Sequence, residues 1–159
     1  MNNIYKNIES LPSIGFNGGI TIANLKKSCS MLPDVPGIYL ITRQSNQDVL
    51  FLEVGTGGHF KGKNPNVAIH ELQENWVKDS AVLYIGKATS LKSRINQYMK
   101  FGSGKNIGHW GGRYIWQISD ADNLLVWWMP VNNPREVEKE LISDFKHEYG
   151  VRPFANLQD

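Results

Sequence analysis

One carboxylate stands where the sequence predicts the buried face of a helix. Glu138, Ile142, Phe145 and Tyr149 are spaced by three or four residues, so an α-helix places them on one face. A carboxylate turned towards a hydrophobic core costs free energy unless a cation or several hydrogen bonds satisfy it. Glu138 therefore either pairs with a lysine or arginine or binds a divalent metal ion, and taken alone it favours the ion pair.

A second group of candidates lies in a cationic segment. Residues 80–119 contain six lysines and arginines and no aspartate or glutamate, whereas the whole chain has 17 basic and 15 acidic residues. Interleaved aromatic residues make this segment typical of surfaces that meet polyanions, but a solvated face balanced by the acidic C-terminal third is an equal alternative. If the segment binds nucleic acid, the candidate residues are Lys92, Lys100, Lys105, His109 and Arg113.

Arg94 and Tyr98 form a third candidate pair, because they are four residues apart on one face of a predicted helix. A guanidinium beside a phenol can clamp a phosphodiester through its fork of donors. The alternative is a surface arginine whose stem packs on the ring. Both interpretations are compatible with the residues alone.

A glycine-rich loop at residues 57–63 matches the G-x-x-x-x-G-K pattern of phosphate-binding loops. Asn64 and Pro65 follow it, where a serine or threonine and the first turn of a helix belong. The loop therefore argues only weakly for nucleotide binding, which is kept as an alternative.

The elements that position these residues are predicted from hydrophobic periodicity and from turn residues. Strands are expected at 38–43, 48–54, 81–86 and 124–130, the first two joined as a hairpin across residues 44–47. Helices are expected at 21–30, 66–77, 91–99 and 134–149, and residues 112–118 fit either state. We therefore predict one α+β domain spanning residues 1–159, with a small antiparallel sheet of about three core strands flanked by helices.

Composition excludes several classes of protein. Hydrophobic residues make up 41% and charged residues 20% of the 159 residues, which is a globular balance. The single cysteine, Cys29, excludes an internal disulfide and a cysteine-rich zinc module, and it suits a cytoplasmic protein. No apolar run reaches the ~18 residues of a membrane span, and no signal-peptide pattern is present, so we expect no membrane partner.

Short motifs in the chain resemble those of a known nuclease family. Gly37-Ile38-Tyr39 and Tyr84-Ile85-Gly86 resemble the two signatures of the GIY-YIG nuclease superfamily. The run YIGKATSLKSRINQYM is similar to the N-terminal nuclease domain of the bacterial excision-repair excinuclease, with Lys87, Arg94 and Tyr98 at matching positions.

The resemblance extends to the C-terminal third of the chain. Glu138, three residues before Leu141-Ile142, looks like the family's metal-binding glutamate, and the run Pro153 to Asn156 is similar to its closing proline and asparagine. The resemblance covers residues 35–45 and 82–157. Residues 44–80 are an insertion between the two motif strands, because Tyr39 and Tyr84 are separated by far more than the family's short hairpin.

The resemblance implies a divalent-metal-dependent endonuclease that hydrolyses phosphodiester bonds of DNA. Glu138 would hold one Mg²⁺ or Mn²⁺ ion, and Arg94 would stabilise charge on the phosphate. Tyr84 would act as general base or orient the water. Tyr39 would support Tyr84, and Lys87 would provide a cation near it. Tyr98 would form a hydrogen bond with phosphate or water, and Asn156 would fix the geometry of the site.

The resemblance also implies a stand-alone nuclease domain without separate DNA-recognition domains. No helix-turn-helix, zinc finger or basic tail is visible, so we expect weakly specific cutting, or targeting by a partner protein. The alternative function is a non-catalytic nucleic-acid-binding module on the same fold.

Overall fold

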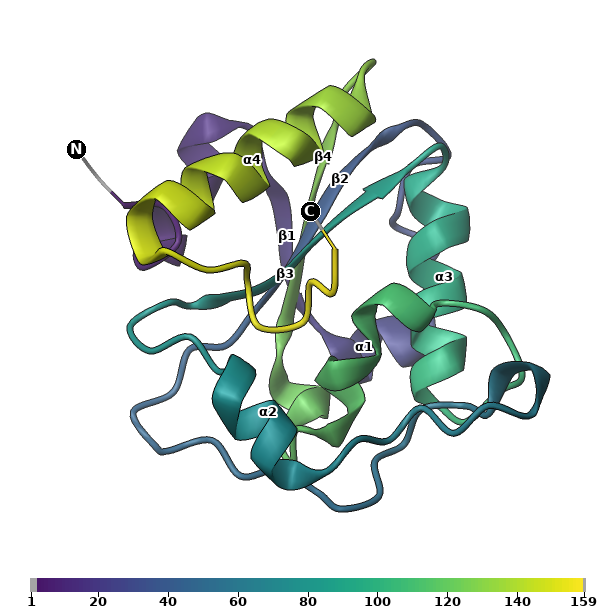
Figure 1. Cartoon of the computed structure of the whole chain (residues 1–159). Helices are drawn as coiled ribbons and strands as arrows, with labels where there is room; N and C mark the ends of the chain where they lie inside the picture. The colour runs from purple at the N-terminus through teal and green to yellow at the C-terminus, as the bar shows by residue number, and fades with distance from the viewer. Residues whose placement is uncertain (1–2, 159) are drawn as a thin grey trace.

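A computed structural model describes residues 3–158, and its centre is a four-stranded antiparallel sheet (Figure 1). The strands are β1 (Asn17–Thr21), β2 (Gly37–Thr42), β3 (Val82–Ala88) and β4 (Leu125–Pro130), in the order β1-β4-β2-β3. The predicted α+β class and antiparallel sheet are confirmed, and the two motif strands β2 and β3 are neighbours despite the insertion.

The prediction of about three core strands missed β1. Its sequence, Asn-Gly-Gly-Ile-Thr, has low strand propensity because glycine and asparagine are depleted in strands. The strand forms because two large side chains of β4 need the space above its glycines: the ring of Trp128 lies against Gly18, and that of Trp127 against Gly19. Tertiary packing therefore decides this element.

The sheet separates two hydrophobic cores. Ile38 and Leu40 of β2 belong to one core, with α4 (Pro134–Tyr149) and the 3-10 helix η1 (Ile8–Ile14). Tyr39 and Ile41 belong to the other, with α1 (Ile22–Lys27), α3 (Leu91–Gly102) and the 3-10 helix η3 (Trp110–Gln117). Alternate residues of β2 thus enter opposite cores, which explains why all six of its residues are buried.

The predicted helices are present, with ends near those expected. Ser90 caps α3, because its Oγ accepts a hydrogen bond from the backbone N–H of Ser93. α4 begins at Pro134 and ends before Gly150, which has the left-handed φ of 76°. The helix expected at 66–77 is α2 (Ile69–Asn75), and the ambiguous residues 112–118 lie mostly in η3. Across residues 3–158, every helix is too short or too polar to serve as a membrane-spanning segment.

The hairpin predicted at 38–54 is wrong. β2 is already paired on both sides, by β3 and β4, so residues 48–54 find no free edge beside it. Phe51 makes an isolated bridge with Ile118 instead, and the N–H of Leu52 donates to the carbonyl of Gln117 at 2.7 Å. The insertion therefore runs along the end of η3 and the residues that follow it.

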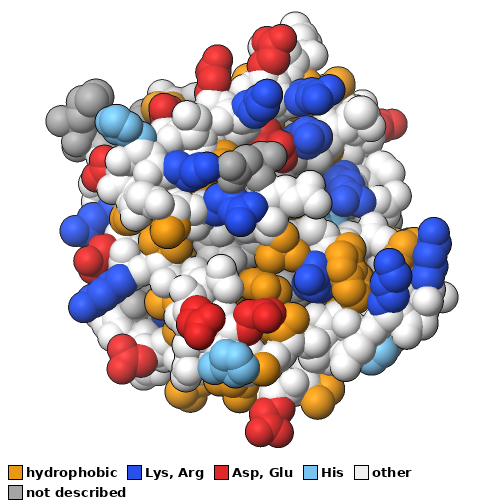
Figure 2. Space-filling model, viewed as in Figure 1, with side chains coloured by type: hydrophobic (Ala, Val, Ile, Leu, Met, Phe, Trp, Pro, Cys, Tyr) orange, Lys and Arg blue, Asp and Glu red, His pale blue; other side chains and the backbone are white. Residues whose placement is uncertain are grey.

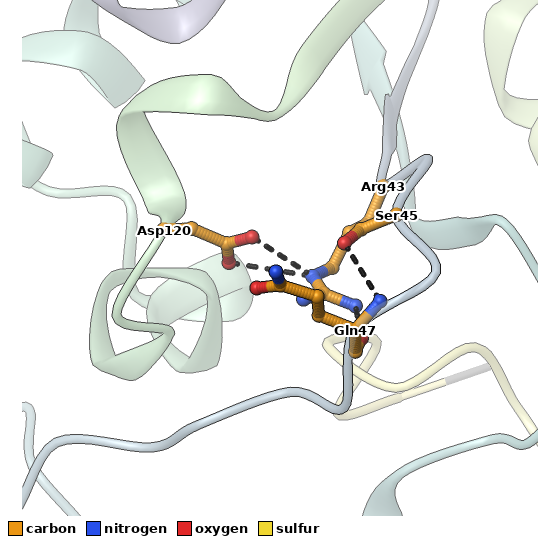
Figure 3. Close-up of polar contacts among 4 residues, drawn as sticks. All are labelled: Arg43, Ser45, Gln47 and Asp120. Carbon is orange, nitrogen blue, oxygen red and sulfur yellow. Dashed lines mark hydrogen bonds and ion pairs between the residues drawn. The ribbon is translucent and has the colours of Figure 1, made fainter.

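Two polar side chains attach the insertion to the domain. The buried amide of Gln117 donates to the carbonyls of Leu52 and Val67 and accepts from the N–H of Val67. At the start of the insertion, Arg43 pairs with Asp120 at 3.2 Å and also donates to the carbonyl of Gln47 (Figure 3). The Arg43 side chain is only 10% exposed, so this ion pair is anchored at the surface of the core.

Tyr39 lies over a glycine of the neighbouring strand. Tyr39 and Gly86 are paired residues of β2 and β3, and the tip of the Tyr39 ring occupies the space where a Cβ of residue 86 would be. The glycine of the second motif is therefore required by the tyrosine of the first.

We expect Gly86→Ala to lower the free energy of unfolding by about 1–3 kcal/mol, because the methyl group must displace the buried Tyr39 ring. Urea denaturation measures the change. The control is Gly111→Ala, where the nearest atom to a new Cβ is the Tyr84 hydroxyl at 3.9 Å. Equal stability of the two variants would contradict the packing argument.

Candidate active site

A pocket of about 700 Å³ lies at the outer edge of β3 and collects most of the predicted site. Its walls come from β2, β3, α3, η3, α4 and the C-terminal segment, which are far apart in the sequence. Of the residues assigned to catalysis or metal binding, all but Tyr98 line it: Tyr39, Tyr84, Lys87, Arg94, Glu138 and Asn156. Lysine and arginine side chains gather over this part of the molecule (Figure 2).

The edge of β3 is sealed by the C-terminal segment. An edge strand leaves alternate N–H and C=O groups unpaired. Asn156 satisfies both groups of Ile85: its Oδ1 accepts from the N–H and its Nδ2 donates to the carbonyl, each at 2.9 Å. The N–H of Ala155 donates to the carbonyl of Leu83 at 2.8 Å. Asn156 therefore holds the strand that carries Tyr84 and Lys87, and it brings the chain end to the pocket.

Glu138 makes the ion pair that its position on the helix predicted as one alternative. Its Oε1 lies 3.3 Å from Nζ of Lys87, with the two side chains 16% and 49% exposed. An ion pair with one half-exposed partner contributes only about 0–1 kcal/mol. Lys87 neutralises Glu138 but does not hold it tightly.

The carboxylate of Glu138 also fits a hydrated divalent ion. Mg²⁺ keeps several of its waters and takes one or two carboxylates together with substrate phosphates. Within residues 3–158, no three His, Cys, Asp or Glu side chains gather into a metal-binding cluster. Among the described residues that line the pocket, Glu138 is the one carboxylate, so water and phosphate would supply the other ligands of such an ion.

His109 lies inside the protein, although the sequence placed it among the nucleic-acid-binding residues. Its side chain is fully buried, and Nε2 lies 2.6 Å from the hydroxyl of Tyr39. Its ring stacks on that of Tyr98, with centroids 3.7 Å apart and planes 13° apart. The sequence did not place His109 in the core because its partner Tyr39 is 70 residues away.

Residues 108–112 comprise the end of the loop after α3 and the first residues of η3, and we call them the 108–112 loop. They hold three side chains of the predicted site. The carbonyl of Gly108 accepts a hydrogen bond from Arg94, and the carbonyl of Gly112 accepts one from Tyr98 at 2.7 Å. His109 holds Tyr39. Tyr98 is completely buried and its hydroxyl is already engaged, so it supports the pocket from behind. This loop was missed as an organising element, although its glycine-rich GHWGG sequence was a signal.

The phenols of the site are protonated at neutral pH. Burial raises the pKa of Tyr84 to about 12, although the nearby Tyr39 hydroxyl and the Arg94 cation lower it. Burial raises the pKa of Tyr39 well above its usual value, and it does the same for Tyr98. At neutral pH these residues therefore donate hydrogen bonds or orient water, and a base role for Tyr84 needs an added cation.

The other predicted nucleic-acid-binding residues are divided between the pocket and the surface. Arg113 lines the pocket, and its guanidinium lies 4.7 and 5.6 Å from the ring centroids of Trp110 and Tyr114. Lys92, Lys100 and Lys105 are exposed and do not line it. The glycine loop at 57–63 is not followed at once by a helix, because α2 begins only at Ile69.

Neither the family models, nor the curated proteins, nor the solved structures include one that matches this chain. The geometry of the pocket and the sequence motifs therefore carry the functional argument.

Because His109 is buried in its neutral form, we expect the free energy of unfolding to depend on pH. Burial, and next the Arg94 cation, hold the pKa of His109 well below its usual value, so the unfolded chain takes up a proton that the folded protein does not. Stability therefore falls as the pH drops below about 6.5, by about 1.4 kcal/mol per pH unit until the folded pKa is reached. We expect His109→Phe, which keeps a ring against Tyr98, to remove this component.

Urea denaturation of wild type and variant between about pH 5 and 7.5 measures the effect. The control is Trp110→Phe at the adjacent position, which exchanges two side chains that do not titrate. Its difference from wild type should be the same at every pH. A difference between wild type and His109→Phe that is also independent of pH would contradict a neutral, buried His109.

Proposed function

We propose that the protein is a divalent-metal-dependent endonuclease with a GIY-YIG-type site that hydrolyses phosphodiester bonds of DNA. The observation that carries the proposal is the meeting of six side chains of the motif positions, Tyr39 to Asn156, in one polar pocket. Their types are those that phosphodiester hydrolysis requires: a carboxylate, cations for the phosphate, and hydroxyls that can orient water.

Arg94 is the proposed phosphate-binding residue. One terminal nitrogen, Nη1, is held by the carbonyl of Gly108 and the side chain of Gln97, at 3.1 and 3.2 Å. The guanidinium has further N–H donors, and the residue lines the pocket. A guanidinium fixed in this way is preorganised to stabilise charge that builds up on a phosphate oxygen.

Tyr84 is the proposed water-orienting residue, and Tyr39 supports it. The two rings lie 5.9 Å apart, and the hydroxyl of Tyr39 is fixed from behind by His109. With its pKa at about 12, Tyr84 enters the reaction protonated. A cation bound near it would favour the phenolate and allow it to accept a proton from water.

Glu138 and Lys87 form the metal-binding side of the proposed site. Glu138 would hold Mg²⁺ or Mn²⁺, which supplies Lewis-acid stabilisation of the phosphate when bound. The weak ion pair lets Lys87 leave Glu138 and turn its ammonium group towards the phosphate. The pocket then keeps the positive charge of Lys87.

The second candidate function is a non-catalytic nucleic-acid-binding module. The observation in its favour is that Lys87 neutralises the carboxylate of Glu138 without a metal ion. Such a module would bind DNA with strong salt dependence and would not cut it.

Nicking of supercoiled plasmid in Mg²⁺ or Mn²⁺ tests the proposal. We expect conversion to open-circular DNA that EDTA abolishes. Glu138→Gln and Arg94→Lys should each lower the rate at least about 10²-fold, because they remove the carboxylate ligand and the bidentate fork. The control is Glu140→Gln, which removes a charge from an exposed position of the same helix and should leave the rate unchanged.

Urea denaturation of each variant shows that the loss is not a loss of folding. Cutting that survives Glu138→Gln would disprove the assignment of Glu138 as metal ligand. DNA binding without cutting under either metal would overturn the nuclease proposal and favour the binding module.

A further inference from the structure

Two segments that lack carboxylates are packed against each other beside the pocket. Residues 54–70 of the insertion contain Lys61 and Lys63 and no aspartate or glutamate, as is true of residues 80–119. The N–H of Gly58 donates to the carbonyl of Phe101 at 2.9 Å, and the N–H of Lys61 donates to Asn106 at 3.1 Å. The fold thus joins two cationic segments into one surface.

The glycines of the insertion loop serve this packing. A Cβ at Gly58 would overlap the carbonyl of Lys105, and one at Gly57 would touch the ring of Phe101. The loop therefore lies against the segment after α3, with its backbone engaged there. This explains the glycine-rich sequence without a bound nucleotide.

Three lysines of the joined surface have no acidic partner among the described residues. Lys61, Lys63 and Lys105 are exposed, and in the described part of the chain no carboxylate lies within ion-pairing distance of them. Figure 2 shows lysine and arginine side chains alternating with apolar ones from the middle of the molecule to its right-hand edge. This region lies over η3, the loop after α3 and the 3-10 helix η2 (Phe60–Gly62). Such a surface attracts a polyanion.

Aromatic rings accompany these cations. Nζ of Lys61 lies 5.2 Å from the centroid of the Phe60 ring, and the guanidinium of Arg113 lies 4.7 Å from that of Trp110. Phe60 and Trp110 are both partly exposed, and Trp110 also lines the pocket. We call the combined surface the cation–aromatic band; its residues are Phe60, Lys61, Lys63, Lys105, Trp110 and Arg113.

The combination of charge and rings points to an unpaired strand. Single-stranded nucleic acid offers both phosphates and free base faces, and its bases stack on aromatic side chains between cations. A duplex presents its phosphates but hides its base faces, so it would contact the lysines and offer no base for the aromatic rings to stack on. An acidic protein surface would likewise leave the rings without stacking partners.

We propose that the cation–aromatic band binds a single-stranded segment of DNA and leads it into the pocket, with Trp110 as a stacking platform at the pocket wall. The proposal rests on the proposed function for the choice of DNA and for the role of the pocket. The proposal also gives the insertion a function, although none of the motif residues lies in it.

Fluorescence anisotropy with a labelled oligodeoxythymidine and a labelled duplex of equal length tests the band. EDTA is present throughout, so that binding is measured without cutting. We expect wild type to bind the single strand more tightly than the duplex. The triple variant Lys61→Ala/Lys63→Ala/Lys105→Ala should weaken single-strand binding and reduce the slope of log K against log salt by about 2, since each lost phosphate contact contributes about 0.7.

Trp110→Ala should weaken single-strand binding about tenfold or more and change duplex binding little, because only the single strand offers a base to stack. The matched control is Lys6→Ala/Lys27→Ala/Lys78→Ala, which removes three exposed lysines outside the band. It should leave the single-strand affinity within about twofold and the salt slope within about 0.5 of wild type. Equal losses in the two triple variants, or equal affinity of wild type for strand and duplex, would overturn the proposal.

The outcomes for band and nuclease are distinguishable. Glu140→Gln should retain full single-strand binding, because this exposed residue lies outside both the band and the pocket. If wild type binds the strand through the band but no plasmid is nicked, the nuclease proposal fails and the band stands. If plasmid is nicked while the lysine variant binds the strand as wild type does, the band fails and the nuclease proposal stands.

Discussion

The position of β3 at the outer edge of the sheet is the constraint on which the site depends. Side chains from opposite faces of a sheet can meet only where the sheet ends, and β3 is an outer strand. Tyr84 comes to the pocket from the face that packs on α3, whereas Lys87 comes from the face that packs on α4, where it meets Glu138. Asn156 makes this edge stable by pairing the backbone groups that would otherwise be exposed.

Behind that edge, buried polar groups give the pocket its rigidity. Tyr39 and Tyr98 lie in the core, and the 108–112 loop gives each hydroxyl a partner: His109 for Tyr39 and a backbone carbonyl for Tyr98. An unpartnered hydroxyl in this position would cost about 1–3 kcal/mol, so the loop and the tyrosines stabilise each other. The same loop anchors Arg94, and a shift of its backbone therefore moves a cation and a phenol together.

Hydrophobic periodicity predicted the elements whose own residues decide them. α3 and α4 carry caps and apolar faces in their sequences, and β2 and β4 are continuous apolar runs, so each was found within a few residues. β1 was missed because its glycines gain their role from Trp127 and Trp128, which are more than a hundred residues away. Residues 48–54 were assigned to a strand because periodicity does not show that both edges of β2 are occupied.

The site divides in the same way. Motif spacing and the helical face of Glu138 were enough to name six of the residues that line the pocket and to predict an ion pair or a metal for Glu138. Which lysine pairs with Glu138, the burial of His109 and the docking of the insertion loop were decided by tertiary structure alone. The physical reason is the separation in sequence over which each property is decided. Residue type and periodicity describe neighbours within a few turns, whereas burial and the choice of partner depend on segments that only the folded chain brings together.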